Sequence, residues 1–280
     1  MGFSVGVLSW RAHKTLVKTL STYAALRDMA DEAVVFFNEI SDEDRAIADR
    51  FGFAAAGCAE NLGILGGTLG LVRALKGDKI LLLQNDNPVN VADGIMRRRL
   101  EQAQRLLDSG EADMVRLRDR FDPSFSDRKK YLGYFPGGDG KDTLLLKTKR
   151  VLRPLKARRM AGRAPAAVER PDIVHPDIFE KNGECFMADS RFVNYSDQPF
   201  MAKRSFELRL LEWADGRKAH ARTLNSKPVP EIIINSRFWR KARYRIAVSE
   251  GVFAHARYDD SFRTGHPAFN ADISTSRGRE

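Results

Sequence analysis

Short, almost wholly apolar runs alternate with helix-like segments over the first third of the chain, and this alternation restricts the possible folds more than any other feature. Buried parallel strands have nearly continuous hydrophobic sequences, because helices cover both faces of their sheet. Strands that alternate with helices at this spacing are typical of βαβ units. The pattern predicts an α/β fold with a mostly parallel central sheet flanked by helices. The predicted strands are residues 3–8, 33–38, 53–56 and 79–84.

The segments between these strands carry helix signals. Ser41, followed three residues later by Asp44, has the form of a capping box, so a short helix is expected to begin there. Apolar residues recur at helical spacing over 13–27, and a long amphipathic pattern follows Pro88. Each predicted strand is therefore joined to the next through a helix, as a parallel sheet requires.

The pattern is less regular in the second part of the chain. The alternation of strand-like and helix-like segments becomes weak after about residue 120 and is clear again near residue 183, which indicates an inserted segment. We expect further strands at 112–119, 183–193, 231–235 and 250–260, and a helix at 201–214. The expected division is a first α/β half at 1–120, a basic loop or lid insertion at 121–172, an elaborated C-terminal half at 173–272 and a disordered tail at 273–280.

The composition is that of a globular, non-secreted protein. The chain has 280 residues, of which 43% are hydrophobic, and no apolar run approaches the ~20 residues of a membrane span. The first ten residues lack a basic region and lead straight into a strand pattern, so no signal peptide is expected. Cys58 and Cys185 are far apart and lie in apolar contexts, which predicts reduced thiols and a cytoplasmic location.

The net charge of +10 is concentrated in one segment. Between Lys147 and Arg170 the chain has nine basic residues and a single acid, Glu169. Such a block indicates a local anionic partner. Three interpretations are open: a lid over a donor diphosphate, peripheral contact with an anionic membrane surface or a lipid-linked acceptor, and a solvated insertion. Nucleic acid is disfavoured, because no aromatic residues interrupt the block and no nucleic-acid-binding motif is found elsewhere.

Polar groups follow four of the predicted strands where each strand ends. In an open parallel sheet, ligands bind at the carboxyl ends of the strands, which lie at one edge. These groups are therefore expected to surround a single site. They are Ser9–Arg11, Asn38–Glu39, Glu60–Gly63 and Asn85–Asn87.

The segment "ILLLQNDNPV" at 80–89 contains the most specific of these groups. A carboxylate at a strand end, here Asp86, can hold a divalent cation whose other positions are filled by phosphate oxygens and water. The flanking amides can bind hydroxyl groups without adding negative charge. The alternative is that these residues cap the helix that follows Pro88, since Asn and Asp favour caps and turns.

Three stretches in order, "VGVLSW" with the helix "TLVKTLSTY", then "ENLGILGGTLG", then "ILLLQNDNPV", resemble the nucleotide-sugar-binding half of the large family of inverting, family 2-like glycosyltransferases with the A-type fold. The resemblance covers the first 90 residues. It implies transfer of a sugar from a nucleoside-diphosphate sugar, with a divalent metal, Mn or Mg, on the donor diphosphate. The chain departs from the family in its Asp-x-Asp-type motif, where Asn85 and Asn87 flank the single acid Asp86. This departure leaves a weaker or metal-independent site open.

The resemblance also implies roles for residues of the donor site. Ser9, Trp10 and Arg11 would border the nucleobase, and Glu39 would contact the base or ribose. The remaining donor-site candidates are Asn61, Gly63, Asn85, Asp86 and Asn87.

The metal and the catalytic base are expected from the second half. His255, in "GVFAHARYDD", matches a late histidine that completes the metal site in many A-type enzymes, with His266 as a second candidate. An inverting transfer needs a carboxylate that accepts the proton of the acceptor hydroxyl. The leading candidate is Asp197, placed before the predicted helix at 201–214, and Asp189 is its rival.

These observations predict a metal-assisted glycosyltransferase that acts on a hydroxyl of a surface glycan, such as lipopolysaccharide or capsule. Two alternatives remain. One is a nucleotidyltransferase acting on a sugar phosphate, although "SWRAHK" after the first strand lacks the glycine-rich loop expected there. The other is a noncatalytic module that binds anionic glycan or nucleic acid through the basic block. A dinucleotide-binding dehydrogenase is disfavoured, because its glycines should follow the first strand.

Overall fold

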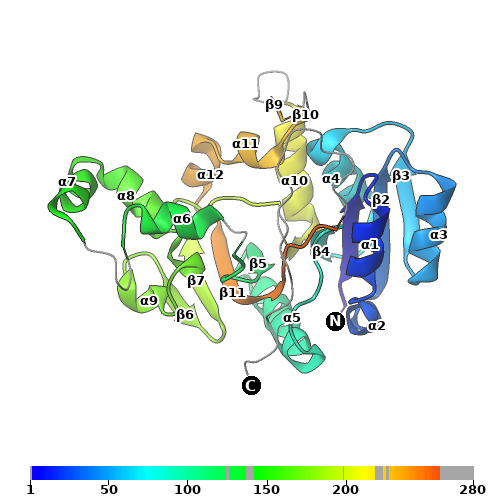
Figure 1. Ribbon diagram of the computed structural model, residues 1–280, viewed down its shortest axis with the longest axis horizontal. Coiled ribbons are helices and arrows are strands. Elements are labelled where there is room, and N and C mark those ends of the chain that lie inside the picture. The colour runs from blue at the N-terminus through cyan, green and yellow to red at the C-terminus, as the bar shows by residue number, and fades with distance from the viewer. Residues whose placement is uncertain are drawn as a thin grey trace.

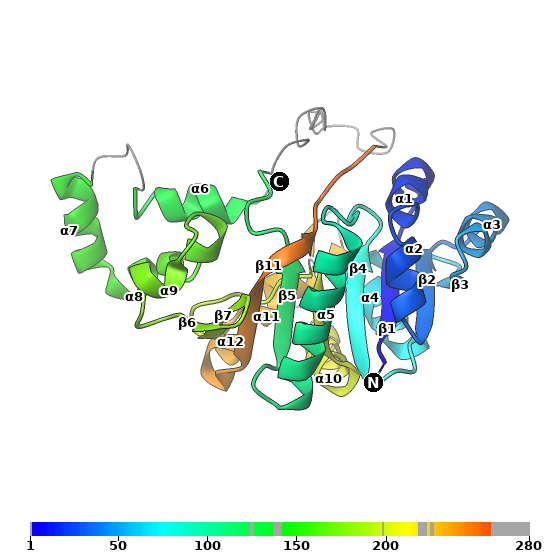
Figure 2. The same cartoon turned by 90° about the horizontal axis from the view of Figure 1, so that it is seen from below.

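The computed structural model describes residues 2–123, 126–136, 142–197, 199–217, 223–224 and 227–258. A nine-stranded sheet lies at the centre, with helices on both of its faces (Figures 1 and 2). In chain order the elements are β1 (Ser4–Ser9), α1 (His13–Leu20), α2 (Ala24–Met29), β2 (Glu32–Asn38), α3 (Asp42–Arg50), β3 (Ala54–Cys58), α4 (Gly63–Ala74), β4 (Lys79–Gln84), α5 (Asp93–Asp108), β5 (Met114–Arg118), α6 (Ser126–Leu132), α7 (Leu144–Leu152), α8 (Pro154–Ala161), the 3-10 helix η1 (Ala164–Ala166), α9 (Pro171–Val174), β6 (Glu180–Asn182), β7 (Cys185–Asp189), β8 (Phe200–Lys203), α10 (Arg204–Asp215), β9 (Thr223–Leu224), β10 (Lys227–Pro228), α11 (Pro230–Ile234), α12 (Arg237–Ala242) and β11 (Arg245–Phe253).

The strand order of the sheet is β3-β2-β1-β4-β8-β5-β11-β7-β6. The strands β1 to β4 pair only in parallel with one another, as the apolar runs predict. The strand β8 is antiparallel to both β4 and β5, and β11 is parallel to β5. Most strands therefore point the same way, and their carboxyl ends share one edge of the sheet, which we call the carboxyl edge. The predicted α/β fold is confirmed.

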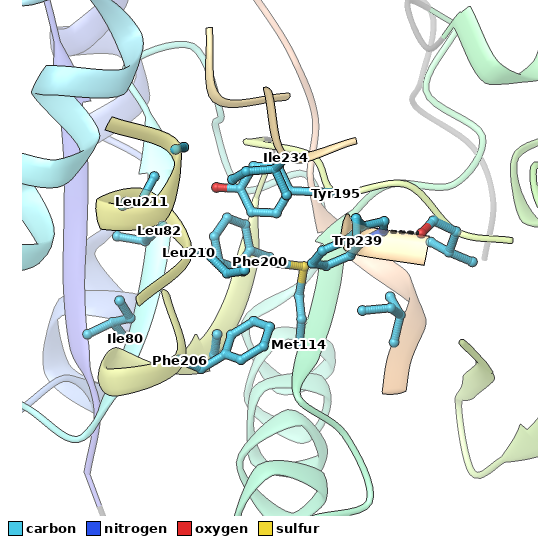
Figure 3. Packing of buried hydrophobic residues seen from close by; sticks show 14 of the residues in the cluster. Ile80, Leu82, Met114, Tyr195, Phe200, Phe206, Leu210, Leu211, Ile234 and Trp239 are labelled. Carbon is cyan, nitrogen blue, oxygen red and sulfur yellow. Dashed lines mark hydrogen bonds between the residues drawn. The ribbon is translucent and has the colours of Figure 1, made fainter. Parts of the chain in front are cut away.

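Two apolar clusters cover the two faces of the sheet. Leu81 and Leu83 of β4 pack with Leu100 of α5 on one face, whereas Ile80 and Leu82 point to the other. The second cluster joins β4, β5 and β8 to α10, α11 and α12 (Figure 3), where Trp239 is fully buried and donates from Nε1 to the carbonyl oxygen of Val193 at 2.9 Å. The alternation along β4 is what a strand buried on both faces requires.

The glycines of α4 allow this helix to lie close to the sheet. A Cβ atom on Gly67 would be 2.8 Å from both Asn38 and Leu8, and one on Gly70 would be 2.5 Å from the ring of Phe36. The glycine-rich stretch therefore serves helix–sheet packing along most of its length.

The structure corrects three predictions of local structure. Residues 201–203 of the predicted helix at 201–214 belong to β8, and α10 begins only at Arg204. The predicted strand at 231–235 is the helix α11. The described part of the insertion at 121–172 is largely helical rather than a loop, with α6, α7, α8 and η1. The predicted tail at 273–280 lies outside the described residues.

No helix among the described residues is both long and apolar enough to cross a membrane. Cys58 and Cys185 are free thiols, and Cys58 is only partly buried. Burial raises the pKa of the Cys185 thiol to about 12, so this thiol stays protonated and unreactive near neutral pH.

Glu207, on α10, gives a testable pH dependence of stability. Its side chain is fully buried; Oε1 accepts from the hydroxyl of Tyr195 at 2.7 Å, and Oε2 has no hydrogen-bond partner among the described residues. Burial raises the pKa of Glu207 to about 7. A raised folded-state pKa stabilises the fold at low pH, and this stabilisation is lost as pH rises through about 7.

We expect Glu207→Gln to remove this dependence. Relative to the unchanged protein, the free energy of unfolding of the variant should rise by about 3 kcal/mol between pH 5 and pH 8, because a pKa unit corresponds to about 1.4 kcal/mol. Denaturant unfolding at several pH values measures the effect. Glu212→Gln, a half-exposed position on the same helix, is the control and should leave the profile unchanged. Parallel profiles for Glu207→Gln and the unchanged protein would show that Glu207 is ionised in the fold.

Candidate active site

The carboxyl edge brings together the polar groups that follow β1, β2 and β4. The backbone N–H of Asn85 donates to the carbonyl oxygen of Leu8 at 3.0 Å, and Asn85 Nδ2 donates to Ser9 Oγ at 3.3 Å. The ends of β1 and β4 are thus tied to each other directly. The prediction that these strand ends surround one place follows from parallel pairing in the observed register.

Trp10, Arg11 and Glu39 form a connected group between the ends of β1 and β2. Glu39 accepts from Trp10 Nε1 at 2.5 Å and from Arg11 at 3.0 Å. Arg11 and Glu39 have positive φ angles of 46° and 58°, which non-glycine residues rarely adopt. Strain of this kind concentrates at ligand-binding sites. Trp10 is 41% exposed, so a flat aromatic face and a carboxylate are both available to a ligand.

Asn61 and Gly63 lie where α4 begins. The backbone N–H of Gly63 donates to Asn61 Oδ1 at 2.8 Å, and Asn38 Nδ2 donates to the carbonyl oxygen of Gly63 at 3.3 Å. Gly63 has a φ of +71°, and a Cβ there would be 2.7 Å from Lys227. Backbone conformation and the close approach of β10 therefore both require glycine at this position.

The segment after β4 forms a tight turn. The backbone N–H of Gln84 donates to Asn87 Oδ1 at 2.7 Å, and Tyr23 donates its hydroxyl to the carbonyl oxygen of Asn87 at 2.6 Å. Asn87 is completely buried, so its amide organises the turn rather than meeting a ligand. The next helix, α5, begins at Asp93 with Ala92 as its N-cap and no side-chain cap, which excludes the helix-capping alternative for Asp86.

Asp86 is buried and bound to two basic side chains from the segment after β11. Its Oδ2 accepts from Arg257 Nε at 2.5 Å and lies 3.3 Å from His255 Nε2. Burial alone would raise the pKa of Asp86, but hydrogen bonds and charge from His255 and Arg257 outweigh burial and lower it. The carboxylate is consequently ionised at neutral pH.

The sequence-predicted metal ligands Asp86 and His255 are thus brought together. A carboxylate oxygen and an imidazole nitrogen suit a manganese-like ion, with diphosphate oxygens and water as its other ligands. No cluster of three or more His, Cys, Asp or Glu side chains that could hold a metal occurs among the described residues. The pair therefore fits a cation shared with a bound diphosphate, once Arg257 leaves Asp86. His266 lies outside the described residues.

Asp197, the leading candidate for the base, also lies at the carboxyl edge. It precedes β8, and Gln84 Nε2 donates to its carbonyl oxygen at 3.3 Å. Its backbone N–H donates to Glu231 of α11 at 3.2 Å. Burial raises the pKa of Asp197 well above its usual range, and the charge and hydrogen bond of Glu231 and the charge of Asp86 raise it further. The placement has a different cause from the one predicted, because a strand rather than a helix follows Asp197.

Asp189, the rival base, lies at the opposite edge of the sheet. It ends β7, which is antiparallel to β11, and it is paired with Arg245 at the start of β11. Its carboxylate binds Arg191 Nε at 2.7 Å. Asp189 therefore lies at the amino ends of the parallel strands, whereas Asp86 and Asp197 lie at the carboxyl edge.

Sequence reasoning missed three residues near this site. Glu231 was hidden in a predicted strand, and Arg257 stands two positions after His255 without a recognised motif. Arg116 lies on β5, where burial lowers its pKa and Glu231 and Asp127 raise it. The signal for Arg116 was present in "MVRLRDR": arginines at every second position of a buried strand share one face.

A recess of about 570 Å³ lies elsewhere, at the carboxyl-terminal end of α5. It is lined by Gln102, Asp108 and Asn182 among others. Asp108 is bound to Lys79 at 2.7 Å, at the start of β4 and so at the amino edge. This recess contains none of the site residues predicted from the sequence.

No family model and no curated protein matches the chain. Solved structures with a similar fold include S. aureus TarS, at a TM-score of 0.48 and 13% identity, over 91% of this chain and 37% of that one. Glucosyl-3-phosphoglycerate synthase from Mycobacterium tuberculosis, in complex with Mn2+, UDP and glucosyl-3-phosphoglycerate, matches at 0.44 and 15% identity, over 92% and 73%. The mannosyltransferase PcManGT from Pyrobaculum calidifontis, in complex with GDP-Man and Mn2+, matches at 0.34 and 17%, over 41% and 34%. The likeness is one of fold.

Proposed function

We propose that this protein is a glycosyltransferase that transfers a sugar from a nucleoside-diphosphate sugar to a hydroxyl group. One observation carries the proposal. Two carboxylates at the carboxyl edge, Asp86 and Asp197, have environments that shift their pKa values in opposite directions. An acid with a lowered pKa suits a cation, and an acid with a raised pKa suits proton transfer, so the two environments match the two proposed roles.

The donor nucleotide is proposed to lie over the ends of β1 and β2. The exposed ring of Trp10 offers a surface on which a base can stack, and Glu39 offers acceptors for the base or the ribose hydroxyls. Arg11, 54% exposed, holds Glu39 in place and supplies positive charge near the phosphates. Asn85 and Asn61 would provide neutral hydrogen-bonding groups beside the same ligand.

Asp86 and His255 are proposed to hold a divalent cation, Mn or Mg. Such an ion would neutralise the charge that develops on the departing diphosphate. Arg257 binds Asp86 Oδ2 in the described structure, so its guanidinium lies where a phosphate oxygen can reach it after displacement. The divalent ion, the Arg257 guanidinium, or both together would stabilise the departing diphosphate.

Asp197 is proposed to act as the base. The acceptor oxygen attacks the anomeric carbon, the bond from that carbon to the diphosphate oxygen breaks, and the hydroxyl proton passes to a carboxylate oxygen of Asp197. Glu231 positions Asp197 and keeps its pKa high, which makes the ionised form a stronger base. The residue then returns the proton to solvent.

The acceptor is proposed to be a hydroxyl of a surface glycan, such as lipopolysaccharide or capsule. The support is the set of additional helices that follow β5, on the side of the site where Asp197 lies. Arg116 on β5 interacts electrostatically with Glu231, and the helices α6, α7 and α8 extend away from that side of the sheet (Figure 1). A partly anionic acceptor would meet positive charge there.

Thermal denaturation with nucleoside diphosphates and their sugars tests this function. We expect one nucleoside diphosphate to raise the melting temperature in the presence of Mn2+, since a ligand that binds only the native state stabilises it. Glu39→Ala should lower the apparent affinity for the nucleotide, obtained from the concentration dependence of this shift, about tenfold. Glu101→Ala, which removes an exposed acid on α5, should leave it unchanged. A shift with nucleoside triphosphates alone would favour nucleotidyl transfer. The absence of any nucleotide effect would contradict the proposal.

A further inference from the structure

The helix α7 presents an apolar face that the rest of the chain leaves uncovered. Leu144, Leu145, Val151 and Leu152 are 80%, 76%, 77% and 74% exposed, and α7 has no buried residue. Leu155, in the first turn of α8, is 78% exposed and continues this surface. We call these five residues the leucine face. Large apolar side chains that gather at such exposure in a folded protein mark an interaction site.

The leucine face is not a consequence of a loosely attached helix. Its four α7 members occupy positions one, two, eight and nine of the helix, which bring them to one side. The opposite side of α7 is held against the segment after α6: Arg150 donates to the carbonyl oxygen of Tyr134 at 2.6 Å, and Lys149 Nζ lies 4.2 Å from the centroid of the Tyr134 ring. The helix is therefore held so that its apolar side faces outward.

Positive charge surrounds the leucine face. Residues 144–161 contain seven lysines and arginines and no acid. Lys147, Arg153 and Lys156 are exposed, and Lys147 lies within the same helix as four of the apolar residues. Apolar side chains next to basic ones are the pattern of helices that lie in the headgroup region of a membrane.

The position of α7 makes the surface accessible to a flat partner. α7 lies at one end of the molecule, at the greatest distance from α3 and β3, in both views (Figures 1 and 2). Figure 2 also shows α6 and α7 on the side of the sheet toward which β5 runs, which is the side of the carboxyl edge. The helix that carries the leucine face is therefore at the periphery of the molecule, toward the carboxyl edge.

We propose that the leucine face and its surrounding cations form a docking surface for an anionic lipid bilayer. Aliphatic side chains enter the acyl boundary, and the lysines and arginines bind lipid phosphates. A second copy of the chain is a poorer occupant, because two surfaces of this charge repel each other. Nucleic acid is poorer too, because its phosphates cannot cover leucines. The inference stands independently of the enzymatic activity proposed above.

Sedimentation with vesicles tests the proposal on the full chain. We expect binding to vesicles of phosphatidylcholine and phosphatidylglycerol in equal parts, weaker binding at high salt, and little binding to phosphatidylcholine alone. The double variant Leu145→Ser with Leu152→Ser should lower partitioning at least tenfold. Leu62→Ser, a 42% exposed leucine where α4 begins, is the apolar control and should bind as the unchanged protein does.

The cations have a matched control as well. Lys147→Gln with Lys156→Gln should lower partitioning about fivefold per lysine. Arg97→Gln with Arg98→Gln removes two exposed charges from α5 and should have a much smaller effect. Binding that survives the leucine substitutions, or no binding to anionic vesicles at all, would overturn the proposal. A dimer in analytical ultracentrifugation that the leucine substitutions dissociate would overturn it also, in favour of a second copy.

Discussion

Asp86→Ala is expected to lower sugar transfer about a thousandfold or more. The substitution removes the only carboxylate in the turn after β4 and leaves Arg257 and His255 without their shared partner. Loss of a group that stabilises charge in the transition state typically has an effect of this size. Initial rates with saturating donor, measured with and without Mn2+, give the result.

The control separates loss of chemistry from loss of fold. Asp86→Asn keeps the side-chain volume but not the charge, and it should be nearly as inactive as Asp86→Ala. Asp108→Asn breaks a comparable acid–cation pair, with Lys79 at the opposite edge, and should retain activity. Full turnover in Asp86→Ala with an unchanged response to Mn2+ would remove Asp86 from the proposed mechanism.

Asp197→Asn is the second substitution with a large expected effect, a loss of about a thousandfold in kcat. General-base catalysis contributes about 100- to 10,000-fold. The apparent affinity for the donor should change little, because Asp197 acts on the acceptor proton. Asp189→Asn, at the other edge of the sheet, is the matched control and should be fully active. A reversed result, with Asp189 essential and Asp197 dispensable, would refute the assignment.

Glu231→Gln tests the positioning role within the same experiment. Glu231 raises the pKa of Asp197, so its neutralisation should lower that pKa. The ionised base then persists to lower pH, and the acidic limb of the kcat profile should move toward lower pH. A merely structural role for Glu231 would reduce activity at every pH without moving the limb.

The donor half of the fold was predictable because its signals are local. The apolar runs at 33–38 and 79–84 are long enough to specify buried parallel strands, and their polar ends then converge through pairing alone. Ser9 and Asn85 meet because β1 and β4 are neighbours. Asp86 and His255 meet through a long-range arrangement, which only the resemblance to a known family pointed to.

The elements around Asp197 were harder to predict because they are short. The strand β8 has four residues, "FMAK", and the helical pattern of α10 that follows it extends over them. Only its place between β4 and β5 makes this segment a strand. Similarly, "EIIIN" has strong β propensity, but Pro230 and packing against the apolar cluster favour the helix α11. Tertiary context decided both cases.

The antiparallel strand β8, in the middle of the sheet, has a consequence for how the two acids are held. Because β8 is antiparallel to β4, the chain enters β8 beside the end of β4, so the segments that carry Asp86 and Asp197 flank the same end of this strand pair. The relative position of these two segments therefore depends on backbone hydrogen bonds of the sheet and not on the helices around it. Movement of the helices around the sheet, or binding of a partner at α7, would displace bound substrates but would not separate the segments that carry Asp86 and Asp197.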